Sequence, residues 1–263
     1  MTNKTIAGIA LAAGAAGLAA NNADAAPDQA KVDEAIKSLK EYDWGADRKT
    51  LDPIAQAINA THGDAAARKK IETALIAALP GASRSAQDFI CRRLRVVGTT
   101  ASVKPLAALL CDEKASAIAR YALERHCCPS ATDALSAALG KASKKLKPGI
   151  IGSLGIRRDK KSVSAICKFL SDSDGMTARA ATKALALIGT PDAAKALCAC
   201  AAKAPAAIKV QVADACLICA EQLLADGEKA AAIGVYKALK GDDQPKHVKV
   251  AAMKGMLTAA SKK

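Results

Sequence analysis

Cysteines are the residues of this chain whose spacing comes closest to a chemical motif. The chain holds nine of them, and four occur as Cys198-x-Cys200 and Cys216-x-x-Cys219. Four thiolates at such spacings can surround a tetrahedral zinc ion, and cysteines of an exported protein can also pair as disulfides. Because the cysteine count is odd, at least one thiol cannot pair within the chain.

Helical geometry argues against zinc at these four cysteines. Cys198 and Cys200 are two residues apart, so their side chains differ by about 200° around a helix and cannot both face one ion. Cys216 stands where earlier repeats, described below, have leucine, and Cys219 stands where one repeat earlier has Ile188. A free cysteine behaves as a small hydrophobic residue. We therefore predict core packing for these cysteines, with no metal or cofactor, and leave a disulfide between one pair open.

The histidines give no catalytic pattern. Three are present, and His126 stands beside Cys127 and Cys128 near an expected helix end. Adjacent residues rarely reach each other as nucleophile and base, so we interpret His126 as a structural group on the core side of its helix. The sequence has no H-E-x-x-H zinc motif, P-loop, G-x-S-x-G elbow or C-x-x-C-H haem motif. We therefore predict no catalytic residue and a protein that is not an enzyme.

A glycine pattern, Gly149-x-x-Gly152-x-x-Gly155, lies inside an expected helix. Each of these glycines costs about 1 kcal/mol of helix stability relative to alanine. Close approach of a neighbouring helix is a better reason for that cost than phosphate binding, so we expect tight helix packing here.

The formal charge of +14 raises the question of a nucleic-acid partner. Stacking on single-stranded bases needs aromatic side chains, and these make up 2% of the chain and are dispersed along it. Lysines at an expected helix C-terminus also offset the helix dipole without any ligand. Nucleic acid is therefore disfavoured, and another anionic partner stays open. The densest basic stretch consists of Lys141, Lys144, Lys145, Lys147, Arg157, Arg158, Lys160 and Lys161.

The elements that must position these residues are short helices that recur at a fixed spacing. One apolar residue recurs near the middle of a helix in each repeat, and we call these residues the apolar marks. They follow one another at intervals of 29, 31, 31 and 31 residues, at Leu94, Leu123, Leu154, Leu185 and Cys216. A second series precedes them at matching intervals, at Leu106/Leu110, Leu135/Leu139, Ile166/Leu170 and Leu197/Ala201. Two marked helices every ~30 residues are typical of a stacked helical-pair solenoid. The alanine-rich sequence has no alternating strand pattern, which agrees with an all-α fold.

The repeat pattern resembles the HEAT and short HEAT-like repeat superfamily over about residues 83–260. The residues that carry the resemblance are Val103-x-x-Leu106, Val163-x-x-Ile166, Ala122-Leu123, Ala184-Leu185 and the exit Ile188-Gly189. It implies a right-handed α-solenoid of antiparallel helix pairs with repeats of about 30–31 residues. Members of that superfamily mostly act as binding scaffolds, and a few are lyases for tetrapyrrole attachment or DNA-base glycosylases.

The N-terminal part of the chain differs from the repeats. Residues 1–25 combine a lysine-containing start, an uncharged apolar run and an Ala23-Asp24-Ala25 cleavage pattern, the plan of a secretory signal. The run is short for a bilayer span of ~20 residues, so we predict an exported mature chain without a transmembrane span and leave an uncleaved anchor open. Residues 26–82 are predicted to cap a solenoid that covers residues 83–263. Helix starts are expected at Ser85-x-x-Asp88, Ser130 and Thr190-Pro191.

The second helix of each repeat offers a candidate contact surface. If each apolar mark points to the paired helix, residues two positions away point nearly opposite, by about 160°. In HEAT-like arrays the second helices line the concave surface. A continuous apolar row edged by charge indicates a protein or peptide groove, although a register error of one residue, or a terminal segment covering it, would remove it. The predicted residues are Arg92, Val96, Tyr121, Arg125, Ile156, Lys183, Leu187 and Ile218.

These observations predict an exported, non-enzymatic binding or assembly scaffold with a basic, partly apolar concave groove. Its expected partner is a protein or peptide, and the groove favours an acidic one. The alternative is a HEAT-like enzyme or enzyme partner of the lyase type, acting on a cofactor or saccharide. A smooth open groove would favour the scaffold, and a deep pocket with convergent polar side chains would favour the enzyme.

Overall fold

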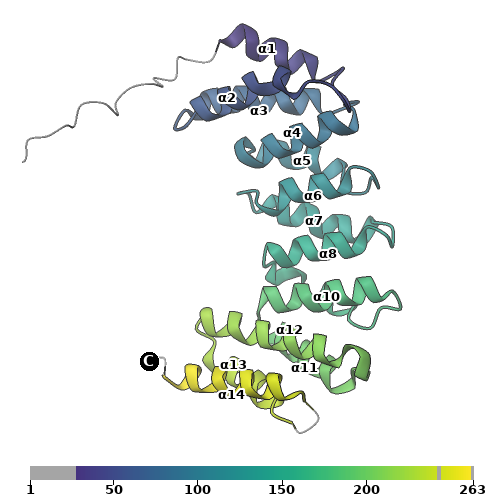
Figure 1. Cartoon of the computed structure of the whole chain (residues 1–263), viewed down its shortest axis with the longest axis vertical. Helices are drawn as coiled ribbons and strands as arrows, with labels where there is room; N and C mark the ends of the chain where they lie inside the picture. Colours follow the sequence, from purple (N-terminus) through teal and green to yellow (C-terminus); the bar gives the residue numbers. More distant parts are fainter. Residues whose placement is uncertain (1–27, 242–243, 262–263) are drawn as a thin grey trace, which may run out of the picture.

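The computed structural model describes residues 28–241 and 244–261, and its regular elements in that part are all helices (Figure 1). Two 3-10 turns, Arg48–Leu51 and Lys160–Ser162, accompany the α-helices. The α-helices are α1 (Gln29–Ser38), α2 (Asp52–Ala60), α3 (Ala65–Ala78), α4 (Arg84–Val97), α5 (Thr100–Ala108), α6 (Ser116–Glu124), α7 (Ser130–Lys141), α8 (Lys147–Ile156), α9 (Val163–Cys167), α10 (Gly175–Ile188), α11 (Pro191–Lys203), α12 (Ala206–Ala225), α13 (Lys229–Ala238) and α14 (Lys246–Ser261).

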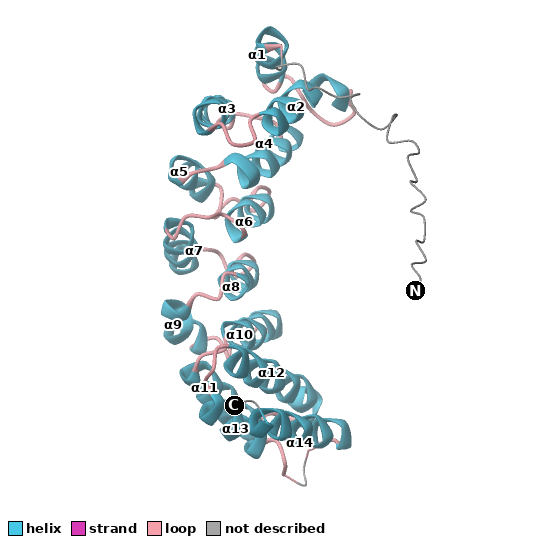
Figure 2. Ribbon diagram, turned by 90° about the vertical axis from the view of Figure 1, so that its left-hand side faces the viewer, coloured by secondary structure: helices cyan, strands magenta, loops and turns pink. Residues whose placement is uncertain are grey.

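The helices stack in two layers along one axis (Figure 2). One layer contains α3, α5, α7, α9 and α11, and the other contains α4, α6, α8, α10 and α12. In the layer from α4 to α12 each helix packs on the next, and in the other layer α5 packs on α3 and α7, and α11 packs on α9. The array bows, and the layer from α4 to α12 lies on its inner, concave side (Figure 2). The prediction of an all-α solenoid of stacked helix pairs is confirmed.

The repeating apolar residues form one continuous core. All five marks of the inner layer, from Leu94 to Cys216, are 0% exposed. In the outer layer Leu106, Leu135 and Ile166 are also fully buried. Leu170 is half-buried instead, because α9 ends at Cys167 and leaves Leu170 in the turn that follows. Each repeat thus buries its apolar side only by stacking on its neighbours, as expected for a solenoid.

The spacing of the buried leucines in the outer layer already begins in α3, one repeat before the predicted start of the solenoid. Leu75 and Leu79 are buried and precede Leu106 and Leu110 by 31 residues. Helices α1 and α2 pack on each other at this end of the array. The domain boundaries at residues 26 and 83 remain predictions, and the predicted signal at residues 1–25 lies outside the described residues. Within the described part, no helix has both the length and the apolar character that crossing a bilayer requires.

All three predicted helix starts lie within one or two residues of the observed ones, but only Thr190 caps its helix as predicted. Thr190 caps α11, with its hydroxyl oxygen accepting from the Ala193 N–H at 3.2 Å. Helix α4 is capped by Ser83 rather than by Ser85, because the Ser83 hydroxyl oxygen accepts from the N–H of Ala86. Helix α7 begins at Ser130 itself and has no side-chain cap.

The glycine pattern in α8 has three different environments. A Cβ atom on Gly155 would lie 2.6 Å from the Ala184 Cα, so α8 and α10 approach closely at this point, as predicted. A Cβ on Gly149 would meet the guanidinium of Arg120 at 2.5 Å, so a side chain rather than a helix requires that glycine. Gly152 faces open space, and close packing does not explain it.

Arg157 connects the end of α8 to the end of α6. Its guanidinium donates to the main-chain carbonyl oxygens of Leu123, His126 and Cys128 at 2.6, 2.9 and 3.0 Å. The last carbonyls of a helix have no partner within the helix. Arg157 therefore satisfies the C-terminal end of the preceding repeat, so this member of the dense basic stretch is engaged within the fold.

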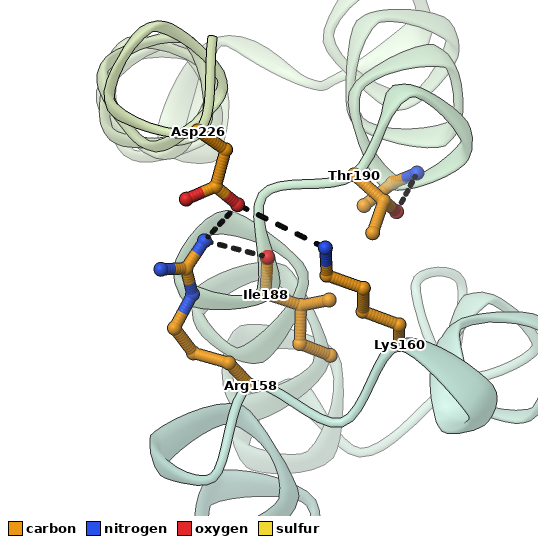
Figure 3. A network of polar contacts seen from close by, with 6 residues as sticks. Arg158, Lys160, Ile188, Thr190 and Asp226 are labelled. Carbon is orange, nitrogen blue, oxygen red and sulfur yellow. Dashed lines mark hydrogen bonds and ion pairs between the residues drawn. The ribbon is translucent and has the colours of Figure 1, made fainter. Parts of the chain in front are cut away.

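Arg158 makes a similar connection in the other direction (Figure 3). It donates to the carbonyl oxygen of Ile188 at 3.4 Å and to the carboxylate of Asp226 at 2.7 Å, which lies 68 residues further along the chain. Lys160 approaches the same carboxylate at 3.9 Å. Arg158 adopts φ 52°, a left-handed conformation that is uncommon for a residue with a side chain. The ends of α8, α10 and α12 are thus joined by polar contacts.

Candidate functional site

The eight residues predicted for the contact surface all lie on the concave layer, and each is exposed or half-buried. Val96, Ile156 and Ile218 are 55%, 45% and 40% exposed, high values for large apolar side chains. The set comprises Arg92 and Val96 on α4, Tyr121 on α6, Arg125 just after α6, Ile156 at the end of α8, Lys183 and Leu187 on α10, and Ile218 on α12. The geometry is compatible with the predicted groove, whose role in binding stays a prediction.

At the N-terminal end of this surface, arginines of α4 cover an aromatic ring of α6. The guanidinium carbon of Arg92 lies 5.2 Å from the centre of the Tyr121 ring, and that of Arg95 lies 4.1 Å from it. Cation–π contacts of this kind are worth about 0.5–1 kcal/mol at exposed sites. Arg95, one turn beyond Arg92, was not predicted for the surface. The two arginines hold the half-buried Tyr121 in place.

Arg92 is paired with a carboxylate of its own helix. Its Nε lies 2.6 Å from one carboxylate oxygen of Asp88, and its Nη2 lies 3.3 Å from the other. The hydrogen bond with Asp88 is the main reason that the pKa of Arg92 is raised. Both side chains are well exposed, so the pair adds little stability. It orients the guanidinium over the ring instead.

A pocket of ≈ 610 Å³ opens beside this cluster, between α4 and the loop that follows α1. Trp44 stands at the pocket with 95% of its surface exposed. The pocket is lined by Tyr42, Asp43, Trp44, Gly45, Ala46, Arg48, Arg84, Ser85, Asp88, Phe89 and Arg92. Trp44 escaped prediction because it belongs to no apolar repeat. Its signal in the sequence is a lone tryptophan in a polar turn, Asp43-Trp44-Gly45, with no apolar neighbours to bury it.

Hydrogen bonds hold the Trp44 loop against the start of α4. The Ser83 hydroxyl donates to the Tyr42 carbonyl oxygen, and the Ser85 hydroxyl donates to the Asp43 carboxylate at 3.1 Å. The pKa of Asp43 is lowered, chiefly by a hydrogen bond from the Trp44 backbone and then by Ser85. The exposed indole therefore sits on an ordered loop.

Four of the six aromatic residues of the chain gather in this region. Tyr42, Trp44 and Phe89 line the pocket, and Tyr121 adjoins it through Arg92. These aromatic residues are dispersed in the sequence but not in space, because α6 packs on α4 and the loop of Tyr42 and Trp44 is hydrogen-bonded to the start of α4. Tryptophan, tyrosine and arginine are the residues that most often dominate the energy of protein interfaces.

The cysteines of α12 pack in the core as predicted. Cys216 and Cys219 are fully buried, and burial raises the pKa of Cys219 to about 12. Cys198 and Cys200 are half-buried at the edge of the core. A hydrogen bond with Cys216 lowers the pKa of Cys198 to about 7. All nine cysteines are free thiols in the structure, so no disulfide connects the pairs that the sequence left open.

Comparison with known proteins identifies the repeats. Residues 132–216, from α7 into α12, match the family model of HEAT repeats. The match, with the two-layered array around it, confirms the resemblance to the HEAT-like repeat superfamily. No curated protein matches the chain as a relative. HEAT repeats are typically non-enzymatic scaffolds for protein partners.

Proposed function

We propose that this HEAT-like repeat protein is an exported binding scaffold whose concave face takes an extended, acidic protein segment. The observation that carries the proposal is the row of apolar side chains on the concave layer: Val96, Ile156 and Ile218 are exposed on α4, α8 and α12, and the half-buried Tyr121 and Leu187 lie on the helices between them. A continuous apolar surface rimmed by polar groups is typical of an interaction site. The general role of HEAT repeats as protein-interaction scaffolds supports it.

The spacing of the repeats favours an extended partner. Packed helices lie about 8–10 Å apart, whereas an extended chain advances about 3.3 Å per residue. A segment that runs along the groove would therefore meet a new helix about every third residue. Ile156, Leu187 and Ile218 would each then contact one anchor side chain.

The charges around the row favour acidic side chains on that segment. Arg125 and Lys183 are exposed beside the apolar row, and Arg48 and Arg84 line the Trp44 pocket at its N-terminal end. The formal net charge of +14 would attract an acidic partner before contact is made. Trp44 offers an exposed aromatic anchor at that end. Binding should weaken as salt concentration rises, because exposed charges are screened.

The groove is tested by capture from an envelope extract of the native host, with mass spectrometry of what is retained. We expect Ile156→Glu and Leu187→Glu to lose the proteins that the unchanged chain retains. Ile156→Glu should alter the free energy of unfolding by only about 0.5 kcal/mol, because Ile156 is exposed. Leu187 is half-buried, so Leu187→Glu should cost more and is compared with Ile156→Glu after its folding is checked. Arg92→Glu together with Arg125→Glu should weaken capture in a salt-dependent way.

Leu257→Glu is the matched control, since Leu257 is 70% exposed on α14 and lies outside the predicted row. It introduces the same charge and should leave capture intact. Equal capture by all of these variants would contradict the groove. A large fall in melting temperature for Ile156→Glu would contradict the exposure on which the proposal depends.

Export is tested separately, by N-terminal sequencing of the protein recovered from its host. We expect the mature chain to begin at Ala26 or within a few residues of it, because the Ala23-Asp24-Ala25 pattern fits a signal-peptidase site. A mature pool that retains residues 1–25 would contradict cleavage and export as proposed.

A further inference from the structure

The connector between α6 and α7 brings three potential metal ligands together. One ligand atom from each of His126, Cys127 and Cys128 lies within 4.8 Å of the others. The two sulfur atoms are 3.7 Å apart. Two thiolates on a tetrahedral zinc ion, each at about 2.3 Å from it, would be separated by about 3.8 Å. The sulfur atoms therefore already have the separation of two ligands of one ion.

Hydrogen bonds determine which nitrogen of His126 is free to bind. The Ser102 hydroxyl donates to the carbonyl oxygen of Thr99 at 2.9 Å, so its oxygen can only accept from His126 Nε2, 3.0 Å away. This network assigns the proton to Nε2 and leaves Nδ1 with a lone pair. Nδ1 accepts from the Cys128 backbone N–H at 3.3 Å, a long hydrogen bond that a metal ion can replace.

Neighbouring residues hydrogen-bond to the three proposed ligands. Histidines that bind metal almost always donate their other N–H to a polar neighbour, as His126 does to Ser102. The Thr100 hydroxyl donates to the Cys128 sulfur at 3.3 Å, which stabilises a thiolate. The guanidinium of Arg157 donates to the carbonyl oxygens of His126 and Cys128, and its positive charge offsets the negative charge of the two thiolates. His126 is 4% exposed and anchored, whereas Cys127 is exposed and leaves an entry path.

We propose that His126 Nδ1 and the thiolates of Cys127 and Cys128 bind one thiophilic metal ion, of the class of Zn²⁺ or Cu⁺. Thiolate and imidazole ligands select such ions over Mg²⁺ or Ca²⁺. Binding forms two metal–sulfur bonds and one metal–nitrogen bond and releases the two thiol protons to water, with no change of oxidation state. A fourth position stays open to solvent or to a ligand. This proposal replaces the expectation of a metal-free chain and is independent of the groove.

Cobalt(II) is the probe, added to the reduced full-length chain after the reductant is removed. We expect one Co²⁺ per chain, with a sulfur-to-cobalt charge-transfer band and the strong visible bands of a tetrahedral site, both bleached by added Zn²⁺. Cys127→Ser and Cys128→Ser should each lose the charge-transfer intensity of one thiolate. Ser102→Ala should weaken binding about tenfold, since it removes the group that orients the imidazole.

Cys111→Ser is the matched control, because Cys111 is another exposed thiol and should not affect the bands. Circular dichroism checks that the serine variants are folded. If the Cys128→Ser variant does not fold, Cys127→Ser alone tests the proposal, because Cys127 is exposed and its replacement should not affect folding. Absence of the sulfur band at saturating Co²⁺, or identical binding by the Cys127→Ser variant, would overturn the proposal. A Cys127–Cys128 disulfide in protein isolated from its host would do so too, because it consumes both ligands.

Discussion

Cys216 and Cys111 carry the same thiol in opposite surroundings. Cys216 is fully buried on α12, at the position where the earlier repeats have leucine, whereas Cys111 is exposed after α5. A hydrogen bond with Cys198 and then burial raise the pKa of Cys216, so it stays protonated and acts as a small apolar side chain. The same residue type is therefore a packing element at one position and a surface group at another.

The first prediction compares serine at these two positions. Cys216→Ser should lower the free energy of unfolding by about 1–3 kcal/mol, because it places a polar hydroxyl in the apolar core where the thiol packs as a small hydrophobic group. Cys111→Ser should change it by less than about 0.5 kcal/mol. Denaturant unfolding followed by circular dichroism measures both. Similar stability of the two variants would mean that Cys216 does not pack as the structure has it.

At the scale of the element, α8 shows how one helix meets its neighbours at different distances. Gly155 lies against the backbone of α10, where a methyl group would be 2.6 Å from the Ala184 Cα. Gly152, one turn earlier, has room for a methyl group, which would meet nothing within 4 Å. The contact between α8 and α10 therefore depends on Gly155 alone among the three glycines. Gly149 makes room for the Arg120 guanidinium instead, and no contact requires a glycine at position 152.

The second prediction uses this contrast. Gly155→Ala should destabilise the chain by about 1–3 kcal/mol, because α8 and α10 must move apart. Gly152→Ala should stabilise it by about 0.5–1 kcal/mol, because alanine favours the helix and meets no obstacle. Thermal unfolding of the two variants is the measurement. If Gly155→Ala were the more stable of the two, the close approach of α8 and α10 would be wrong.

At the scale of the whole molecule, stability depends on contacts between successive repeats. The core of the described residues runs continuously along the array, so each repeat is held by its neighbours and by the interfaces between them. Arg157 strengthens one such interface through the carbonyl oxygens at the end of α6, and Arg158 strengthens the next through Asp226. These arginines stand at the middle of the array, where a weak interface would divide it.

The third prediction is that Arg157→Met divides the array. We expect a loss of about 2–3 kcal/mol, since the buried carbonyls of Leu123 and His126 would lose charged donors. Native-state hydrogen exchange should then show faster exchange in α6 and α7 than in α11 and α12. Lys161→Met, a nearby exposed position, is the control and should change neither. Uniform exchange across the array would show that the interface does not depend on Arg157.

The sequence by itself determined the helix order, the buried leucine positions and the exposed row on the concave layer. This was possible because a solenoid repeats one local arrangement, so a residue's place within the period decides whether it faces the core or solvent. Val96, Ile156 and Ile218 were therefore predictable from their offset to Leu94, Leu154 and Cys216 alone.

Only the tertiary structure decided how polar side chains from different repeats meet. The contacts of Arg95 with Tyr121, Arg158 with Asp226 and Ser102 with His126 join residues 24 to 68 positions apart. They depend on the rotation between neighbouring repeats and on side-chain rotamers, and a periodic apolar pattern specifies neither. The Trp44 pocket escaped prediction for the same physical reason, because a loop outside the period is placed by its hydrogen bonds to α4.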